Sequence, residues 1–148
     1  MIGDTGYEFK RLLEQLGQLL FHWCRLEQTL DEELRNLGAE LPTGSTLGDR
    51  LAAWKRACGS EALGCADPAA WVAREVNRLR AVRNLVVHHL VEVSGRPGGE
   101  PFIRCEKRSG QGSKLTRVTL AELEATVEAI DQCRGCLRSV PWSRQSAG

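Results

Sequence analysis

The feature that most constrains the fold is a long apolar repeat at the start of the chain. Between Tyr7 and Leu37, large apolar side chains recur at intervals of three and four residues. They are Phe9, Leu12, Leu16, Leu19, Trp23, Leu26, Leu30, Leu34 and Leu37. This spacing predicts one amphipathic helix, which Gly38 ends. A helix of about 30 residues is about 45 Å long at 1.5 Å per residue. So long a helix in a chain of 148 residues predicts a helical bundle.

Two further helices are indicated in the middle of the chain. Apolar side chains on one face predict a short helix over residues 47–58 and a longer one over residues 67–91. The longer helix has a strong start signal, because Asp67 suits the N-cap and Pro68 suits the first helical position. Its apolar side chains lie on one side, so the opposite side is a polar face that the core need not bury.

After these helices the chain changes character. Residues 102–107 and 114–119 are short and β-prone, and the intervening Ser-Gly-Gln-Gly predicts a turn, so we expect a small hairpin. Thr119 and Glu122 then match a capping box that opens a last helix, and this helix ends before Pro141.

These elements predict an all-α fold, a four-helix bundle with a small hairpin-like insertion between the last two helices. With 42% hydrophobic and 26% charged residues, the chain suits a packed core rather than disorder. We expect a single helical domain over residues 1–141 and a loose tail over residues 142–148.

Cysteines and the N-terminal sequence bear on the compartment. The first residues lack a basic stretch followed by an apolar segment, and no apolar run is long enough to span a bilayer. We therefore expect a cytoplasmic protein, without a membrane partner, whose six cysteines stay reduced. The close pair Cys133 and Cys136 lacks the second pair that a structural zinc site needs, so packing is the favoured interpretation over metal or redox chemistry.

The charge is distributed unevenly. Residues 1–70 carry 7 basic and 11 acidic side chains, whereas residues 71–117 carry 10 basic and 4 acidic ones, although the whole chain has a net charge of +1. A basic segment of this kind favours the approach of a polyanion. Ordinary surface composition is the alternative explanation.

A compact polar group lies near the end of the third predicted helix. Asn84 and His88 are four residues apart and share one face, Arg80 continues that stripe, and Arg83 lies about 100° from Asn84. A permanent cation, a neutral hydrogen-bonding group and a base that titrates near neutrality suit phosphodiester cleavage without a metal. His89 lies about 140° from Asn84, so we expect a partly buried histidine with a structural hydrogen bond. Incidental polar residues on a solvated face are the competing interpretation.

The stretch Arg83-Asn84-Leu85-Val86-Val87-His88 resembles the motif of the HEPN (higher eukaryotes and prokaryotes nucleotide-binding) domain superfamily. In that motif an arginine and a histidine are separated by four to six residues, often with asparagine directly after the arginine. The resemblance covers approximately residues 7–138 in helix order, although only the short motif is specific. Many members have glycine or tyrosine after the histidine, where this chain has His89 and Leu90.

The resemblance implies a homodimer in which the two motif helices face each other and, in many members, an endoribonuclease without metal or other cofactor. Many such enzymes are toxins of toxin–antitoxin pairs or defence effectors, so an antitoxin or other protein partner is implied. Other members are catalytically silent and bind a nucleotide, a nucleic acid or a protein. On the first alternative Arg83, Asn84 and His88 are catalytic, and we expect three further residues to contact RNA. These are Arg78, Arg80 and His89.

Overall fold

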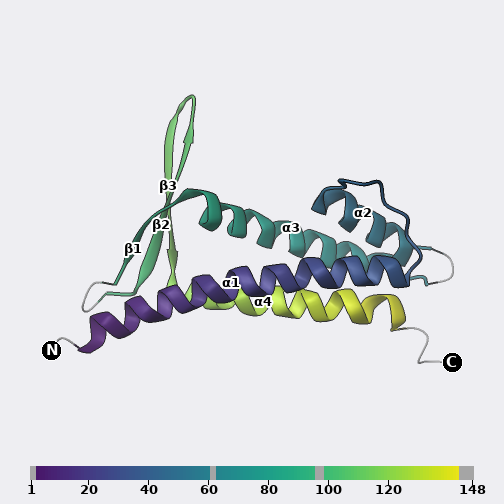
Figure 1. Ribbon diagram of the computed structural model, residues 1–148, viewed down its shortest axis with the longest axis horizontal. Coiled ribbons are helices and arrows are strands. Elements are labelled where there is room, and N and C mark those ends of the chain that lie inside the picture. Colours follow the sequence, from purple (N-terminus) through teal and green to yellow (C-terminus); the bar gives the residue numbers. More distant parts are fainter. Residues whose placement is uncertain (1–2, 61–62, 96–98, 144–148) are drawn as a thin grey trace. The chain divides into compact units, whose positions relative to one another are not determined.

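The computed structural model describes residues 3–60, 63–95 and 99–143. These residues form four α-helices and a three-stranded antiparallel sheet (Figure 1). The helices are α1 (Gly3–Asn36), α2 (Leu47–Cys58), α3 (Ala66–His89) and α4 (Leu120–Ser139), followed by a short 3-10 helix η1 (Val140–Trp142). The strands are β1 (Leu90–Ser94), β2 (Phe102–Ser109) and β3 (Gly112–Thr119). The four predicted helices are therefore present and the protein is mostly helical, but with its three-stranded sheet it is not plainly all-α.

The unpredicted strand β1 accounts for most of this difference. The helix expected over residues 67–91 ends at His89, and Leu90 already pairs with Cys105 of β2. Backbone pairing with a neighbouring strand here overrides the helical spacing of the sequence. At the other end, α3 begins at Ala66, so Asp67 lies in the first turn and is not the N-cap.

The chain divides into two compact units. We call residues 1–21 and 79–129 the sheet unit, and residues 22–78 and 130–148 the α2 unit. The helices α1, α3 and α4 each contribute one segment to both units. The single-domain organisation over residues 1–141 stays a prediction, and most of the tail expected from residue 142 lies outside the described residues.

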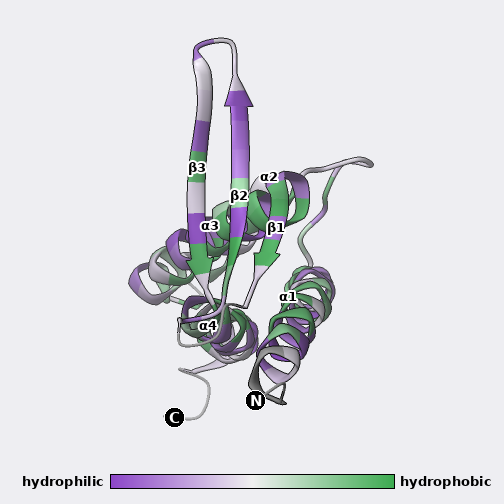
Figure 2. Ribbon diagram, turned by 90° about the vertical axis from the view of Figure 1, so that its left-hand side faces the viewer, coloured by the Kyte–Doolittle hydropathy of each residue, from purple (hydrophilic) through white to green (hydrophobic). Residues whose placement is uncertain are grey.

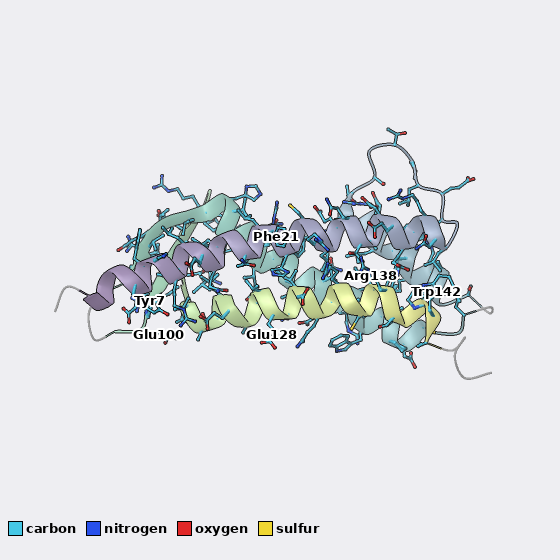
Figure 3. All side chains as sticks on the ribbon, turned by 60° about the horizontal axis from the view of Figure 1, so that its bottom comes forward. Tyr7, Phe21, Glu100, Glu128, Arg138 and Trp142 are labelled. Atoms are coloured by element: carbon cyan, nitrogen blue, oxygen red, sulfur yellow. The ribbon has the colours of Figure 1, made fainter. Side chains whose placement is uncertain are left out.

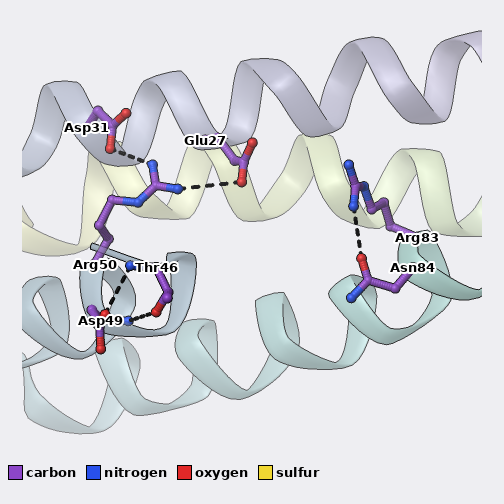
Figure 4. Close-up of polar contacts among 7 residues, drawn as sticks. All are labelled: Glu27, Asp31, Thr46, Asp49, Arg50, Arg83 and Asn84. Atoms are coloured by element: carbon purple, nitrogen blue, oxygen red, sulfur yellow. Dashed lines mark hydrogen bonds and ion pairs between the residues drawn. The ribbon is translucent and has the colours of Figure 1, made fainter. Parts of the chain in front are cut away.

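The α2 unit is built on a helical core, and α2 has the bounds that the sequence predicts. Its buried side chains come from all four helices: Trp23, Leu26, Leu30, Leu34, Leu51, Trp54, Val72, Val76, Ile130 and Leu137. Polar contacts at the edge of this core connect neighbouring helices. Arg50 lies between Asp31, at 2.7 Å, and Glu27, at 3.6 Å (Figure 4). The indole Nε1 of Trp142 donates to the buried carboxylate of Glu33.

In the sheet unit the strands follow the order β1-β2-β3. The predicted hairpin is confirmed as β2 and β3, which pair from Phe102 and Thr119 to Ser109 and Gly112. Its base supplies Ile103, Cys105 and Val118 to a core that α1, α3 and α4 complete with Leu12, Leu19, Leu79, Val86 and Leu123. Its distal half is hydrophilic (Figure 2). The hairpin therefore extends beyond the part of the sheet that packs into the core.

The predicted capping box at the start of α4 is confirmed. The backbone N–H of Thr119 donates to the Glu122 carboxylate at 2.9 Å, and the N–H of Glu122 donates to the Thr119 hydroxyl at 3.1 Å. Both donors would otherwise lack partners at the helix start. The last strand therefore passes directly into α4 without a loop.

The first turns of α1 are less buried than the apolar repeat predicts. Leu12 and Leu19 are buried, but Phe9 is 45% exposed. Tyr7, at the start of the helix, is 63% exposed, and Phe21, which is further along and outside the repeat, is 55% exposed (both labelled in Figure 3). Within the described ranges, no helix combines the length and the apolarity needed to cross a bilayer.

Candidate functional site

The predicted polar group lies at the end of α3 in the sheet unit, and its members differ in exposure. Leu79 and Val86 are buried on the core side of the helix. Arg80, Arg83 and Asn84 are half-buried, and His88 is exposed. The apolar residues that fix this rotation of α3 therefore also set the direction of the polar face.

Arg83 and Asn84 form a direct pair. The Arg83 Nη1 donates to the Asn84 side-chain oxygen at 2.9 Å (Figure 4). The Arg83 Nε is buried and has no hydrogen-bond partner within the described ranges. Across those same ranges no carboxylate lies within ion-pair distance of Arg83. A neutral amide orients this guanidinium, so its positive charge is not cancelled.

The two histidines of α3 occupy different surroundings. His88 is exposed, whereas His89 is half-buried as predicted. Their ring centroids are 6.4 Å apart with an interplanar angle of 73°. The structural hydrogen bond expected for His89 is not found among the described residues. Its ring instead contacts the ring of His88. In the same part of the chain no hydrogen bond joins His88 to Arg83 or Asn84.

The two further arginines predicted to contact RNA differ in their neighbours. Arg80 belongs to the sheet unit, as Arg83 does, and has no carboxylate partner among the residues described. Arg78 belongs to the α2 unit and donates to both carboxylate oxygens of Glu75, at 3.0 and 2.5 Å. Hydrogen bonding from this guanidinium lowers the pKa of Glu75. The ion pair offsets the charge of Arg78, and its contact with RNA stays a prediction.

Basic residues of the sheet form a feature that the sequence reasoning missed. A hollow of about 390 Å³ is lined by Glu92, Gly99, Glu100, Phe102, Arg104, Arg117 and Thr119. The guanidinium carbon of Arg117 lies 4.0 Å from the centroid of the Phe102 ring, and Arg104 pairs with Glu92 at 2.8 Å. The available signal was the basic excess of residues 71–117. That excess is a property of the whole segment and does not single out individual strands.

Four of the six cysteines are buried and pack in the core, whereas Cys24 is exposed and Cys136 is half-buried. All six are free thiols, and Cys133 of the Cys133–Cys136 pair is buried within α4. Burial raises the pKa of Cys133 to about 12 and that of Cys58 to about 12. Thiols with such pKa values are protonated at neutral pH and are poor nucleophiles or metal ligands.

Comparison with family models, with curated proteins and with solved structures gives no match to this chain. The chemistry of the α3 group is therefore the main indication of function. That group offers an exposed imidazole, an uncancelled guanidinium and a carboxamide within about one and a half turns of helix. Such a set can bind a phosphate and accept or donate a proton.

Proposed function

We propose that this protein is a metal-independent endoribonuclease of HEPN type. The observation that carries the proposal is the state of Arg83, which is held by Asn84 and has no carboxylate partner in the described part of the chain. An uncancelled, half-buried guanidinium and an exposed imidazole on the same helix suit the binding of an anion and the transfer of a proton. The fold family and the biological setting as a toxin or defence effector are part of the proposal.

In the proposed reaction, neutral His88 removes the proton from a ribose 2′-OH. The resulting oxygen attacks the adjacent phosphorus, the bond to the 5′-oxygen of the next nucleotide breaks, and a 2′,3′-cyclic phosphate forms. The 5′-oxygen takes up a proton as it leaves. Arg83 neutralises the charge that develops on the phosphoryl oxygens, and Asn84 holds the guanidinium in position. DNA lacks the 2′-OH and is not cut by this route.

The proposed active form is a two-fold homodimer. The reaction requires one group to remove a proton and another to supply one, and each chain offers one exposed histidine at this face. Two facing α3 helices would provide both groups. Light scattering at micromolar concentration should give about twice the chain mass of 16.4 kDa, and a species of single-chain mass alone would contradict the composite site.

The direct test is incubation of the protein with end-labelled single-stranded RNA in the presence of EDTA. We expect fragments that end in a 2′,3′-cyclic phosphate, and no cleavage of DNA of the same sequence. His88→Ala should abolish cleavage with little change in thermal stability, because the side chain is exposed. His89→Ala, at a residue expected to contact RNA, should raise KM but retain cleavage at saturating RNA. Loss of activity in a folded His89→Ala protein, with activity kept in His88→Ala, would show that the base is misassigned.

A second candidate is a catalytically silent module that binds a nucleotide, a nucleic acid or a partner protein such as an antitoxin. It is favoured by the lack of any hydrogen bond between His88 and the Arg83–Asn84 pair among the described residues. On this alternative RNA stays intact with the wild-type protein and with His88→Ala, but both proteins bind it with measurable affinity. The same incubation therefore separates the two candidates.

A further inference from the structure

The hairpin of β2 and β3 begins beside the candidate site. No residue separates the end of α3 at His89 from the start of β1 at Leu90. Leu90 pairs with Cys105, and β2 continues beyond this point to Ser109. Lys107 is two residues further on, which corresponds to about 7 Å of extended strand. The hairpin therefore leaves the sheet as a two-stranded ribbon on the side where α3 ends.

The ribbon places like charges directly opposite each other. Arg104 faces Arg117, and Lys107 faces Lys114. Such pairs destabilise a sheet unless another group offsets them. Glu92 offsets Arg104, and the Phe102 ring contacts Arg117.

The lysine pair has no such compensation. Lys107 and Lys114 are exposed and have no carboxylate within ion-pair distance among the described residues. The nearby Glu106 interacts instead with Arg108 at 3.5 Å. Two uncompensated ammonium groups on a narrow ribbon therefore remain available to an external anion.

Lys107 and Lys114 lie on the same face of the hairpin that packs into the core nearer its base. Residues of a strand alternate between faces, so Lys107 shares a face with Ile103 and Cys105, which are buried. Its partner Lys114 shares that face with Val118, which is buried too. The face is apolar at the base and basic in the hydrophilic distal part (Figure 2). Core packing explains the apolar residues at the base, but it does not explain the lysines of the distal part.

We propose that this basic ribbon, formed by Lys107 and Lys114, binds the phosphate backbone of the RNA that enters the α3 site. The inference rests on the proposed function and adds to it a second contact region. RNA is favoured because the ribbon and the Arg83–His88 group belong to one unit, in which β1 follows α3 directly and pairs with β2. Ammonium groups contact phosphates without reading bases, so this contact increases affinity for long strands without sequence preference. A dinucleotide is too short to reach both regions.

The test compares RNA binding at several salt concentrations. Lys107→Gln/Lys114→Gln is measured in a His88→Ala background, so that RNA is not consumed, by fluorescence anisotropy with a labelled 20-nucleotide single strand. Each phosphate contact to a single strand contributes about 0.7 to the slope of log affinity against log salt. Loss of two contacts should reduce the slope by about 1.4, so the affinity loss between 50 and 200 mM salt should be about 7-fold smaller than in the parent.

The matched control is Lys55→Gln/Arg56→Gln, which removes two exposed positive charges from α2 in the other unit. It should leave the slope unchanged. An unchanged slope in the hairpin variant, or equal changes in both variants, overturns the ribbon inference. The inference also fails if the hairpin substitutions weaken binding to phosphatidylserine vesicles but do not weaken binding to RNA.

Cleavage assays with His88 intact separate this inference from the nuclease proposal. We expect Lys107→Gln/Lys114→Gln to raise KM for the 20-nucleotide strand and to leave cleavage of a dinucleotide unchanged. If RNA is cut but the salt slope does not depend on the hairpin, the ribbon inference fails and the nuclease proposal stands. If RNA is never cut but the hairpin variant loses binding, the nuclease proposal fails and the ribbon stands as an RNA-binding surface.

Discussion

Replacement of Asn84 by aspartate tests whether the charge of Arg83 is what the site requires. The amide oxygen of Asn84 accepts a hydrogen bond from Arg83 at 2.9 Å. A carboxylate has nearly the same shape and places an oxygen at the same position. The substitution therefore keeps the geometry of the pair and cancels the charge of the guanidinium. Stability and activity are expected to change in opposite directions.

The size of the stability change follows from the setting of the pair. Two unit charges 4 Å apart attract each other by about 4 kcal/mol at an effective dielectric constant of 20. Desolvation and solvent screening remove most of this, and measured partly exposed pairs contribute about 0.2–1 kcal/mol. Asn84 lies more than one turn before the end of α3, so the helix dipole changes this figure little. We expect Asn84→Asp to raise the free energy of unfolding by about 0.5 kcal/mol.

The effect on cleavage should be much larger. With the charge of Arg83 cancelled, the developing charge on the phosphoryl oxygens loses its main stabilising group. Removal of a single such donor elsewhere lowers kcat by about 100- to 1,000-fold, and we expect a loss of at least about 100-fold here. Asn77→Asp, an exposed change of the same kind on α3 in the other unit, is the control and should remain active.

The assays are urea unfolding at pH 7 and at pH 3, and cleavage of labelled RNA in EDTA. Arg83 lowers the pKa of the introduced carboxyl below its unfolded value of about 3.9. The added stability is therefore present above that value and is lost as the pH falls through the folded pKa. Cleavage at the wild-type rate by a folded Asn84→Asp protein would refute the role of Arg83 as the phosphate-binding group.

Two further predictions concern stability and thiol reactivity. Trp142→Phe removes the hydrogen bond from the indole to Glu33, which is only 6% exposed. It should cost about 1–3 kcal/mol in urea unfolding, and an unchanged midpoint would contradict a structural role for this contact. At pH 8, Cys24 should react with Ellman's reagent in the folded protein, because it is exposed, whereas Cys58 and Cys133 should react only on unfolding. Because burial raises the folded pKa of both buried thiols, their contribution to stability should be lost as the pH rises above the unfolded value of about 8.5. Rapid labelling of all three in folded protein, or stability that does not decline at alkaline pH, would contradict this reasoning.

Local signals in the sequence predicted much of the fold. The bounds of α2 and the capping box of Thr119 and Glu122 depend on residues close to one another in the chain. The hairpin is also local, because its turn residues lie between its strands. The strand β1 could not be predicted in this way. Leu90 and Val91 fit the helical spacing, and their pairing with β2 depends on contacts that are distant in sequence.

The candidate site shows the same limit. Helical spacing predicted that Asn84 and His88 share a face and that His89 is partly buried. It could not predict that Asn84 orients Arg83, because that contact depends on rotamers that the surrounding packing selects. Nor could it predict the lysine pair of the ribbon, since Lys107 and Lys114 become neighbours only through the register of β2 and β3.

The direct junction between α3 and β1 restricts how this protein can change in evolution. Insertion of one residue after His89 would turn every side chain of β1 to the opposite face of the sheet, and Ser94, now buried, would face solvent. The spacing from Arg83 to the sheet therefore cannot vary without loss of the fold. The turn at Gly110 and Gln111 carries no such constraint, because both residues are exposed. Among descendants of this sequence, length should vary at that turn and stay fixed between Arg83 and Leu90.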